Sequence, residues 1–232
     1  MNQPTAFDPY AETYDAACAE ALSVTGEDRS YFAENRVRWL AASLARCGES
    51  PRSALDFGCG PGSTAPILLR ELHLEQCAGI DTSVRLIELA QKTYGSPAIQ
   101  FRLVGDFQPA ALIDLAYCNG VFHHIPLKER PASLALIHDA LRPGGIFAFW
   151  ENNPWNPGTR YVMSNCSFDS DAVTLAPPEA RRLLRSAGFE IVRTDVLFIF
   201  PRFLKPLRAL ENTLSRLPLG AQYQVLCRKP AK

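Results

Sequence analysis

The 232-residue chain lacks a long apolar run and a net charge. No uninterrupted hydrophobic stretch reaches the roughly 18 residues that a membrane span needs. The first residues have neither the basic start nor the apolar block of a secretory signal. Lys plus Arg and Asp plus Glu balance at 24 each, so no overall field draws the chain to nucleic acid. We therefore expect a cytoplasmic protein with no transmembrane segment and no nucleic-acid partner.

Cysteine pairing is also missing. The seven cysteines are odd in number and scattered, and no two of them form a Cys-x-x-Cys pair. This pattern indicates neither a disulfide framework nor a zinc site. We expect reduced thiols and predict no bound metal.

What the chain does have is a core-forming composition, with 47% hydrophobic residues, and a regular alternation of apolar runs with helical patterns. The predicted strands are 53–57, 76–81, 98–104, 113–118, 145–151, 189–199 and 221–228, and the predicted helices are 63–73, 83–93, 127–141 and 177–187. Strands that alternate with helices predict an α/β fold: a Rossmann-like, doubly wound, mostly parallel sheet with helices on both faces.

Three segments stand apart from this alternation. Residues 1–50 precede the first strand and are predicted to form an N-terminal helical cap or lid, with the main domain at 51–232. Residues 152–176 are rich in Asn, Pro, Ser and Asp and are predicted to be a long loop with a functional role. Residues 201–219 are predicted to be an amphipathic insertion, with one helix over 202–217.

The most informative stretch is 55–62, where an apolar strand ends in Asp56 and a glycine turn follows. Gly58, Cys59 and Gly60 form this turn before a helix start. A strand, glycine turn and helix N-terminus bring bare backbone against a ligand, which predicts an adenosine-containing cofactor. The Gly-x-Gly-x-Gly spacing differs from the dinucleotide fingerprint, and the Asp56 carboxylate would repel a pyrophosphate.

Polar residues also follow the next three predicted strands. Asp81, with Thr82 beside it, lies 23 positions beyond Gly58, where a carboxylate receives ribose hydroxyls. The alternative is that Asp81 caps the next helix, although Thr82 or Ser83 could do so instead. Asp106 and Phe107 could contact an adenine, or could be ordinary turn residues. Asn119 and Gly120 end the fourth strand at the same edge of the sheet.

Together, segments 55–62, 79–81, 105–106, 114–125 and 141–145 resemble the class I S-adenosylmethionine-dependent methyltransferases of the small-molecule type. The resemblance implies seven strands with one antiparallel strand, here 221–228. It also implies that Asp56, Gly58 and Gly60 contact the methionine part of S-adenosylmethionine, that Asp81 contacts the ribose, and that Asp106 and Phe107 contact the adenine. In the same way, Tyr14 resembles a residue of a segment that closes over the cofactor, with plain packing as its alternative.

Methyl transfer from a sulfonium is an in-line displacement that depends mainly on alignment, so an obligatory catalytic residue is not expected. His123, His124 and Glu151 are the candidate catalytic residues, and packing or loop hydrogen bonds are their alternative roles. On the 152–176 loop, the candidate substrate-binding residues are Asn152, Trp155, Arg160 and Tyr161.

The resulting prediction is a methyltransferase that acts on oxygen or nitrogen, with carbon as the third choice, of a small or lipid-linked metabolite. Two alternatives stay open: a non-catalytic S-adenosylmethionine-binding regulatory protein, and a nicotinamide-dependent oxidoreductase. The apolar and basic residues of 198–219 suggest either a helix that caps the core or a peripheral contact with a membrane. The sequence does not indicate an oligomeric state.

Overall fold

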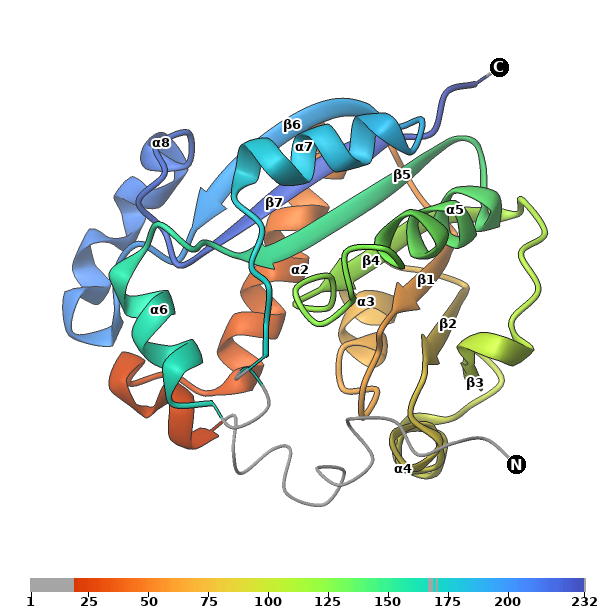
Figure 1. Ribbon diagram of the computed structural model, residues 1–232, viewed down its shortest axis with the longest axis horizontal. Coiled ribbons are helices and arrows are strands. Elements are labelled where there is room, and N and C mark those ends of the chain that lie inside the picture. Colours follow the sequence, from red (N-terminus) through yellow and green to blue (C-terminus); the bar gives the residue numbers. More distant parts are fainter. Residues whose placement is uncertain (1–18, 167–168, 170, 232) are drawn as a thin grey trace.

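The computed structural model describes residues 19–166, 169 and 171–231, in which a seven-stranded sheet has helices on both faces (Figure 1). The strands are β1 Ser53–Phe57, β2 Gln76–Asp81, β3 Ile99–Leu103, β4 Ile113–Asn119, β5 Leu141–Asn152, β6 Glu190–Leu197 and β7 Gln222–Arg228. Their order across the sheet is β3-β2-β1-β4-β5-β7-β6.

Strands β1 to β5 pair in parallel, and β7 runs antiparallel to both β5 and β6. The predicted fold class is therefore confirmed, including the antiparallel strand near 221–228. The chain proceeds from β1 to one side through β2 and β3, and then returns to β1 at β4. This reversal of strand order opens a crevice at the carboxyl ends of β1 and β4, where open α/β sheets bind ligands.

Several helices begin at capping residues or at prolines in the first turn. They are α2 Arg29–Arg46, α3 Ala65–Glu71, α4 Val84–Tyr94, α5 Arg130–Ala140, α6 Pro157–Ser164, α7 Pro177–Ser186 and α8 Glu211–Leu214. The Asp28 side chain caps α2 by accepting from the Tyr31 amide, and Ser83 caps α4 by accepting from the Leu86 amide. Helices α3, α5, α6 and α7 each have a proline in the first turn, where its missing N–H costs no hydrogen bond.

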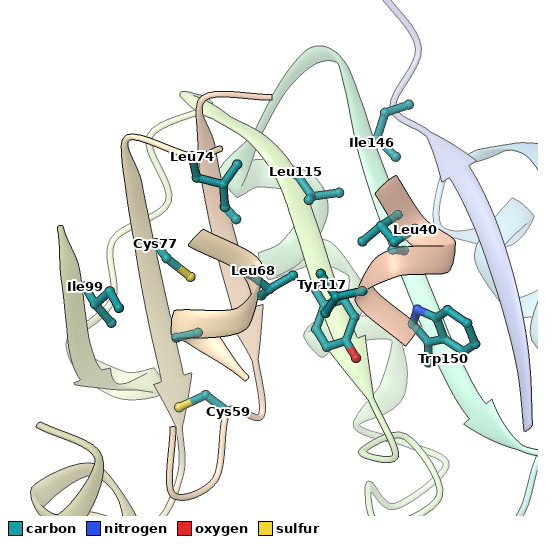
Figure 2. Close-up of a cluster of buried hydrophobic side chains, with 14 of the residues drawn as sticks. Leu40, Cys59, Leu68, Leu74, Cys77, Ile99, Leu115, Tyr117, Ile146 and Trp150 are labelled. Carbon is teal, nitrogen blue, oxygen red and sulfur yellow. The ribbon is translucent and has the colours of Figure 1, made fainter. Parts of the chain in front are cut away.

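Two apolar cores lie on the two faces of the sheet, because successive residues of a strand point to opposite faces. Helices α2, α3 and α4 pack on one face, and α5 and α7 pack on the other. Figure 2 shows the first core, in which Leu40 of α2 and Leu68 of α3 lie with Leu115, Tyr117 and Trp150 of the sheet. These side chains are fully buried or nearly so.

Two predicted segments differ from the structure. The loop predicted over 152–176 contains α6, which begins after an Asn156 cap and Pro157. The single helix predicted over 202–217 is instead a 3-10 segment, η5 (Arg202–Leu210), followed by the short α8. Pro206 lacks the amide that an α-helix needs there, and Leu204 leaves helical geometry at φ −105° and ψ 20°.

The predicted N-terminal lid is described only from residue 19 onward, so Tyr14 lies outside the described residues. Within 19–50, α2 is the long helix, and its Val37, Leu40 and Leu44 pack against the sheet. Among the helices that the structure describes, none has the length and apolar character to cross a membrane.

Candidate functional site

A cavity of about 840 Å³ opens at the carboxyl ends of β1, β4 and β5. The glycine turn after β1 forms one wall, and α2, α6 and the 198–208 segment enclose the rest. The cavity therefore lies at the crevice that the strand order creates. Its lining includes six predicted cofactor residues: Asp56, Gly58, Cys59, Gly60, Asn119 and Gly120.

Gly58 and Gly60 of the turn are each required to be glycine, but on different structural grounds. Both have positive φ, 71° at Gly58 and 53° at Gly60. A Cβ on Gly58 would lie 2.4 Å from Val121 Cγ2, so this residue is glycine because the protein itself packs there. A Cβ on Gly60 would meet nothing within 4 Å, although Gly60 lines the cavity. At Gly60, the missing side chain leaves room for a ligand.

Asp56 places a buried carboxylate at the base of the cavity. Its Oδ2 has no hydrogen-bond partner among the described residues. Asn119 Oδ1 also lacks a hydrogen-bond partner among them. Burial, and then the Asp81 charge, raise the pKa of Asp56 to about 7 against the opposing effect of Arg36. A buried acceptor that faces a cavity needs a donor, and the ammonium of a methionine-type cofactor would supply one.

Asp81 holds the turn and the next helix together. Its Oδ2 accepts from the Gly60 amide and its Oδ1 accepts from the Ser83 amide, both at 2.9 Å. Asp81 and three other predicted cofactor residues, Thr82, Asp106 and Phe107, do not line the cavity. They lie at or just after the carboxyl ends of β2 and β3, and Thr82 and Asp106 are exposed. Their contacts with ribose and adenine remain predictions.

Glu151, at the end of β5, is buried and organises the backbone after β4. Its Oε1 accepts from the amides of Phe122 at 2.7 Å and His123 at 3.3 Å, and its Oε2 lies 2.6 Å from His123 Nδ1. Burial by itself lowers the pKa of His123, but the Glu151 charge and hydrogen bonds to Asp169 and Glu151 outweigh it and raise that pKa to about 10. While His123 holds this proton it cannot act as a general base. The catalytic roles of His123 and Glu151 remain predictions.

Asp169 joins the two histidines and was not identified from the sequence. Its Oδ1 lies 3.3 Å from His124 Nε2 and 3.5 Å from His123 Nε2. Burial raises the pKa of Asp169, but the hydrogen bonds to His123 and His124 prevail and lower it to about 2. All three side chains line the cavity. No local spacing could have revealed this cluster, because Asp169 is far from the histidines in the chain.

A polar chain crosses the floor of the cavity. Asn152 Oδ1 accepts from Gln222 Nε2 at 3.0 Å, and Gln222 Oε1 accepts from Arg36 at 2.9 Å. Arg36 Nε also donates to the Tyr117 hydroxyl at 3.2 Å. Asn152 was predicted as a substrate-binding residue, whereas Arg36 and Gln222 were missed because they come from distant elements.

The other predicted substrate-binding residues point elsewhere. Trp155 and Tyr161 are more than half exposed, Arg160 is exposed, and none of the three lines the cavity. For Arg160 and Tyr161 the reason is helix α6, whose period turns Val162 toward the cavity and leaves these two residues on the side of a second pocket.

Aromatic side chains form the outer wall of the cavity. Phe32 packs edge-on against Tyr31 and Phe198, with ring centroids 5.3 and 5.0 Å apart respectively. Arg208 lies over the Tyr31 ring at 4.6 Å and pairs with Glu27 at 2.9 Å. The cavity thus combines a polar floor near Asp56 with an aromatic wall farther out.

Comparison with known proteins gives consistent matches. The family model described as "Methyltransferase domain" matches residues 29–194. A Trans-aconitate 2-methyltransferase of Methylobacterium radiotolerans is 31% identical over 118 residues, which cover 50% of this chain and 45% of that protein. The chain spans about half the length of the curated relatives it matches.

Solved structures share the fold at low sequence identity. An S-adenosylmethionine-dependent methyltransferase from Mesorhizobium loti has a TM-score of 0.56 and 19% identity, covering 77% of this chain and 91% of that one. The cyclase SpnF has a TM-score of 0.60 and 19% identity, covering 84% and 82%. A cyclase among these neighbours shows that the fold alone does not fix the reaction.

Proposed function

Because this chain belongs to the class I S-adenosylmethionine-dependent methyltransferases, as its methyltransferase domain over 29–194 shows, we propose that it transfers a methyl group from S-adenosylmethionine to a small-molecule acceptor. The proposed receiving atom is oxygen, with nitrogen second and carbon third. The two alternatives, a nicotinamide-dependent oxidoreductase and a non-catalytic binding protein, are not favoured by the family match.

One observation carries the proposal: a single cavity joins the glycine turn to an enclosed aromatic compartment. Open space beside Gly60 and the unpaired Asp56 Oδ2 fit the amino-acid part of the cofactor. The compartment between α2, α6 and the 198–208 segment leaves room for an acceptor next to it. Methyl transfer requires this adjacency, because the acceptor atom must reach the methyl group in line.

When bound, S-adenosylmethionine supplies the electrophilic methyl group. The chain would hold the cofactor's ammonium at Asp56, allow close backbone approach at Gly60, and keep the turn in place through Asp81. The aromatic wall of Tyr31, Phe32 and Phe198 would exclude water from the transfer path. Alignment of the acceptor with the methyl group would account for most of the expected rate enhancement.

The nature of the acceptor follows from the lining. The three arginines of the lining, Arg29, Arg36 and Arg208, all have partners in the protein, so they do not provide a strong cluster of unpaired positive charge for a polyanion. The aromatic wall instead supports an acceptor with an apolar portion, which includes a lipid-linked one. The relatives named Trans-aconitate 2-methyltransferase make the carboxylate oxygen of a small organic acid the first group to test.

The experiment is methyl transfer from isotopically labelled S-adenosylmethionine by the intact chain. The acceptor panel contains trans-aconitate, aliphatic and aromatic monocarboxylic acids, phenols and amines. We expect methylated product with an organic acid or hydroxyl acceptor, and loss of product in Asp56→Ala but not in the exposed control Asp171→Ala. Binding of S-adenosylhomocysteine without methylation of any acceptor would instead indicate the non-catalytic alternative.

A further inference from the structure

His123, His124 and Asp169 bring three ligand atoms of metal-binding type to one point on the cavity wall. These atoms all lie within 4.8 Å of one another. His123 is buried, and His124 and Asp169 are partly buried, so the cluster is not an accident of an exposed surface. Two imidazoles and one carboxylate form a donor set that transition metals accept.

The separations within the cluster are long for hydrogen bonds and are compatible with a coordination shell. Asp169 Oδ1 lies 3.3 Å from His124 Nε2 and 3.5 Å from His123 Nε2. Hydrogen bonds between such atoms are usually about 2.7–3.2 Å long. Ligands about 2.0–2.1 Å from a tetrahedral zinc ion lie about 3.3–3.4 Å apart. The two imidazole nitrogens lie within 4.8 Å of each other. They must move closer together for both to bind the same ion.

Glu151 supplies the outer partner that metal-binding histidines usually have. Its Oε2 lies 2.6 Å from His123 Nδ1, which fixes the ring and directs Nε2 toward Asp169. Glu151 is itself held by the amides of Phe122 and His123. A carboxylate–histidine arrangement of this kind orients a metal ligand and increases its basicity.

We propose that His123 Nε2, His124 Nε2 and Asp169 bind a divalent transition-metal ion, with Glu151 as the positioning residue behind His123. Nitrogen-rich ligation favours Zn²⁺, Co²⁺ or Fe²⁺ over Mg²⁺, Ca²⁺ and Mn²⁺, which prefer oxygen ligands. Three protein ligands leave at least one coordination position open, and the cluster faces the cavity.

This open position would face the compartment assigned to the acceptor. A metal there could bind an acceptor oxygen and favour its deprotonated form, which would select acceptors with a hydroxyl or carboxylate group. This consequence rests on the proposed function, whereas the metal site itself does not. The two are therefore tested separately.

The experiment measures Co²⁺ and Zn²⁺ binding by the intact chain after treatment with a chelator. We expect one equivalent of Co²⁺ with visible absorption of a four- or five-coordinate ion, and displacement by Zn²⁺. Cys166 lines the same cavity, so the spectrum must lack a thiolate-to-cobalt charge-transfer band. His124→Ala and Asp169→Ala should each weaken binding at least tenfold.

The matched control is His138→Ala, because His138 lies 3.7 Å from Asp139 in another histidine–aspartate pair outside the cluster. It should leave stoichiometry and affinity unchanged. Far-UV circular dichroism and thermal unfolding of His124→Ala and Asp169→Ala check that both variants are folded. Absence of stoichiometric binding at millimolar Co²⁺, or binding that survives both cluster variants, overturns the metal site. Either result leaves the proposed methyl transfer intact.

Discussion

Asp56 shows how a single residue couples cofactor binding to pH. Its carboxylate is buried, and its pKa is about 7 because of burial and the nearby Asp81 charge. The ammonium of S-adenosylhomocysteine prefers the ionised form. Below pH 7 a proton must first leave, so we expect affinity to fall up to tenfold per pH unit as pH decreases, and to level off above about 7.5.

This prediction is checked by calorimetry with S-adenosylhomocysteine between about pH 5.5 and 8. Asp56→Asn should lower affinity by about 1.5–3 kcal/mol at high pH, as expected for a lost hydrogen bond to a charged group, and should remove most of the pH dependence. Equal affinity of the unmodified chain across this range would contradict the role of Asp56.

Gly60 and Gly48 are a matched pair for testing whether the missing side chain at Gly60 lets the cofactor approach the backbone. Both have positive φ, and a Cβ at either position meets nothing within 4 Å. Each alanine variant should therefore lose about 1–2 kcal/mol of folding stability, because alanine is strained at positive φ. Only Gly60 lines the cavity. We expect Gly60→Ala to weaken S-adenosylhomocysteine binding at least tenfold and Gly48→Ala to leave it unchanged.

At the scale of elements, the Glu151 carboxylate ties β5 to the backbone that follows β4. It is buried and, in the metal-free chain, it faces His123, whose raised pKa of about 10 keeps the imidazole protonated at neutral pH. Removing one partner of a buried ion pair typically costs about 3–5 kcal/mol. We expect Glu151→Gln to lower the free energy of unfolding by about this amount in urea titrations at neutral pH.

The control for Glu151 is Glu75→Gln, which breaks an exposed pair with Arg52. Exposed pairs contribute about 0–1 kcal/mol, so this change should be almost neutral. If both variants lose similar amounts of unfolding free energy, the contact between Glu151 and His123 does not stabilise the fold as expected.

The segment from η5 to α8 keeps an apolar surface. Phe203 is 79% exposed, Leu210 is 50% exposed, and Arg202 and Lys205 supply positive charge nearby. This combination supports the prediction of a peripheral contact with a membrane, and the basic side chains favour anionic lipid. We expect co-sedimentation with anionic vesicles, and we expect Leu210→Asp, a change outside the cavity lining, to reduce it severalfold. Leu112→Asp, a change at another exposed leucine, should have no effect, and negligible binding by the intact chain would refute the contact.

The elements also show which signals the sequence contains. The bounds of β1 and β2 were predicted correctly because each strand is a short apolar run that ends in polar and turn-forming residues. Helix α6 was missed although Asn156 and Pro157 form a cap and first turn, because the surrounding composition is typical of a loop. The continuous helix over 202–217 was wrong because its apolar period was given more weight than Pro206.

For the site, the glycine turn could be predicted because its chemistry is contiguous in the chain. Arg36, Gln222 and Asp169 could not, because α2, β7 and a segment after α6 bring them to the cavity from distant positions. Such contacts depend on tertiary packing, and the spacing of residues in a single sequence does not predict them.

At the scale of the whole molecule, one cavity collects residues from both ends of the described chain. Helix α2, the carboxyl ends of β1, β4 and β5, helix α6 and the 198–208 segment all contribute to its lining. Binding there should therefore stabilise the fold as a unit, because unfolding of any of these parts would release the ligand.

A ligand that binds only the folded chain at 100 times its Kd adds about 2.7 kcal/mol of stability. For a domain of this size, that corresponds to an increase in Tm of about 5–10 °C. We expect S-adenosylhomocysteine to produce this shift in a thermal unfolding scan and NAD to produce none, because the Asp56 carboxylate repels a pyrophosphate. A shift with NAD alone would favour the oxidoreductase, and no shift with millimolar S-adenosylhomocysteine would remove the basis of the proposed methyl transfer.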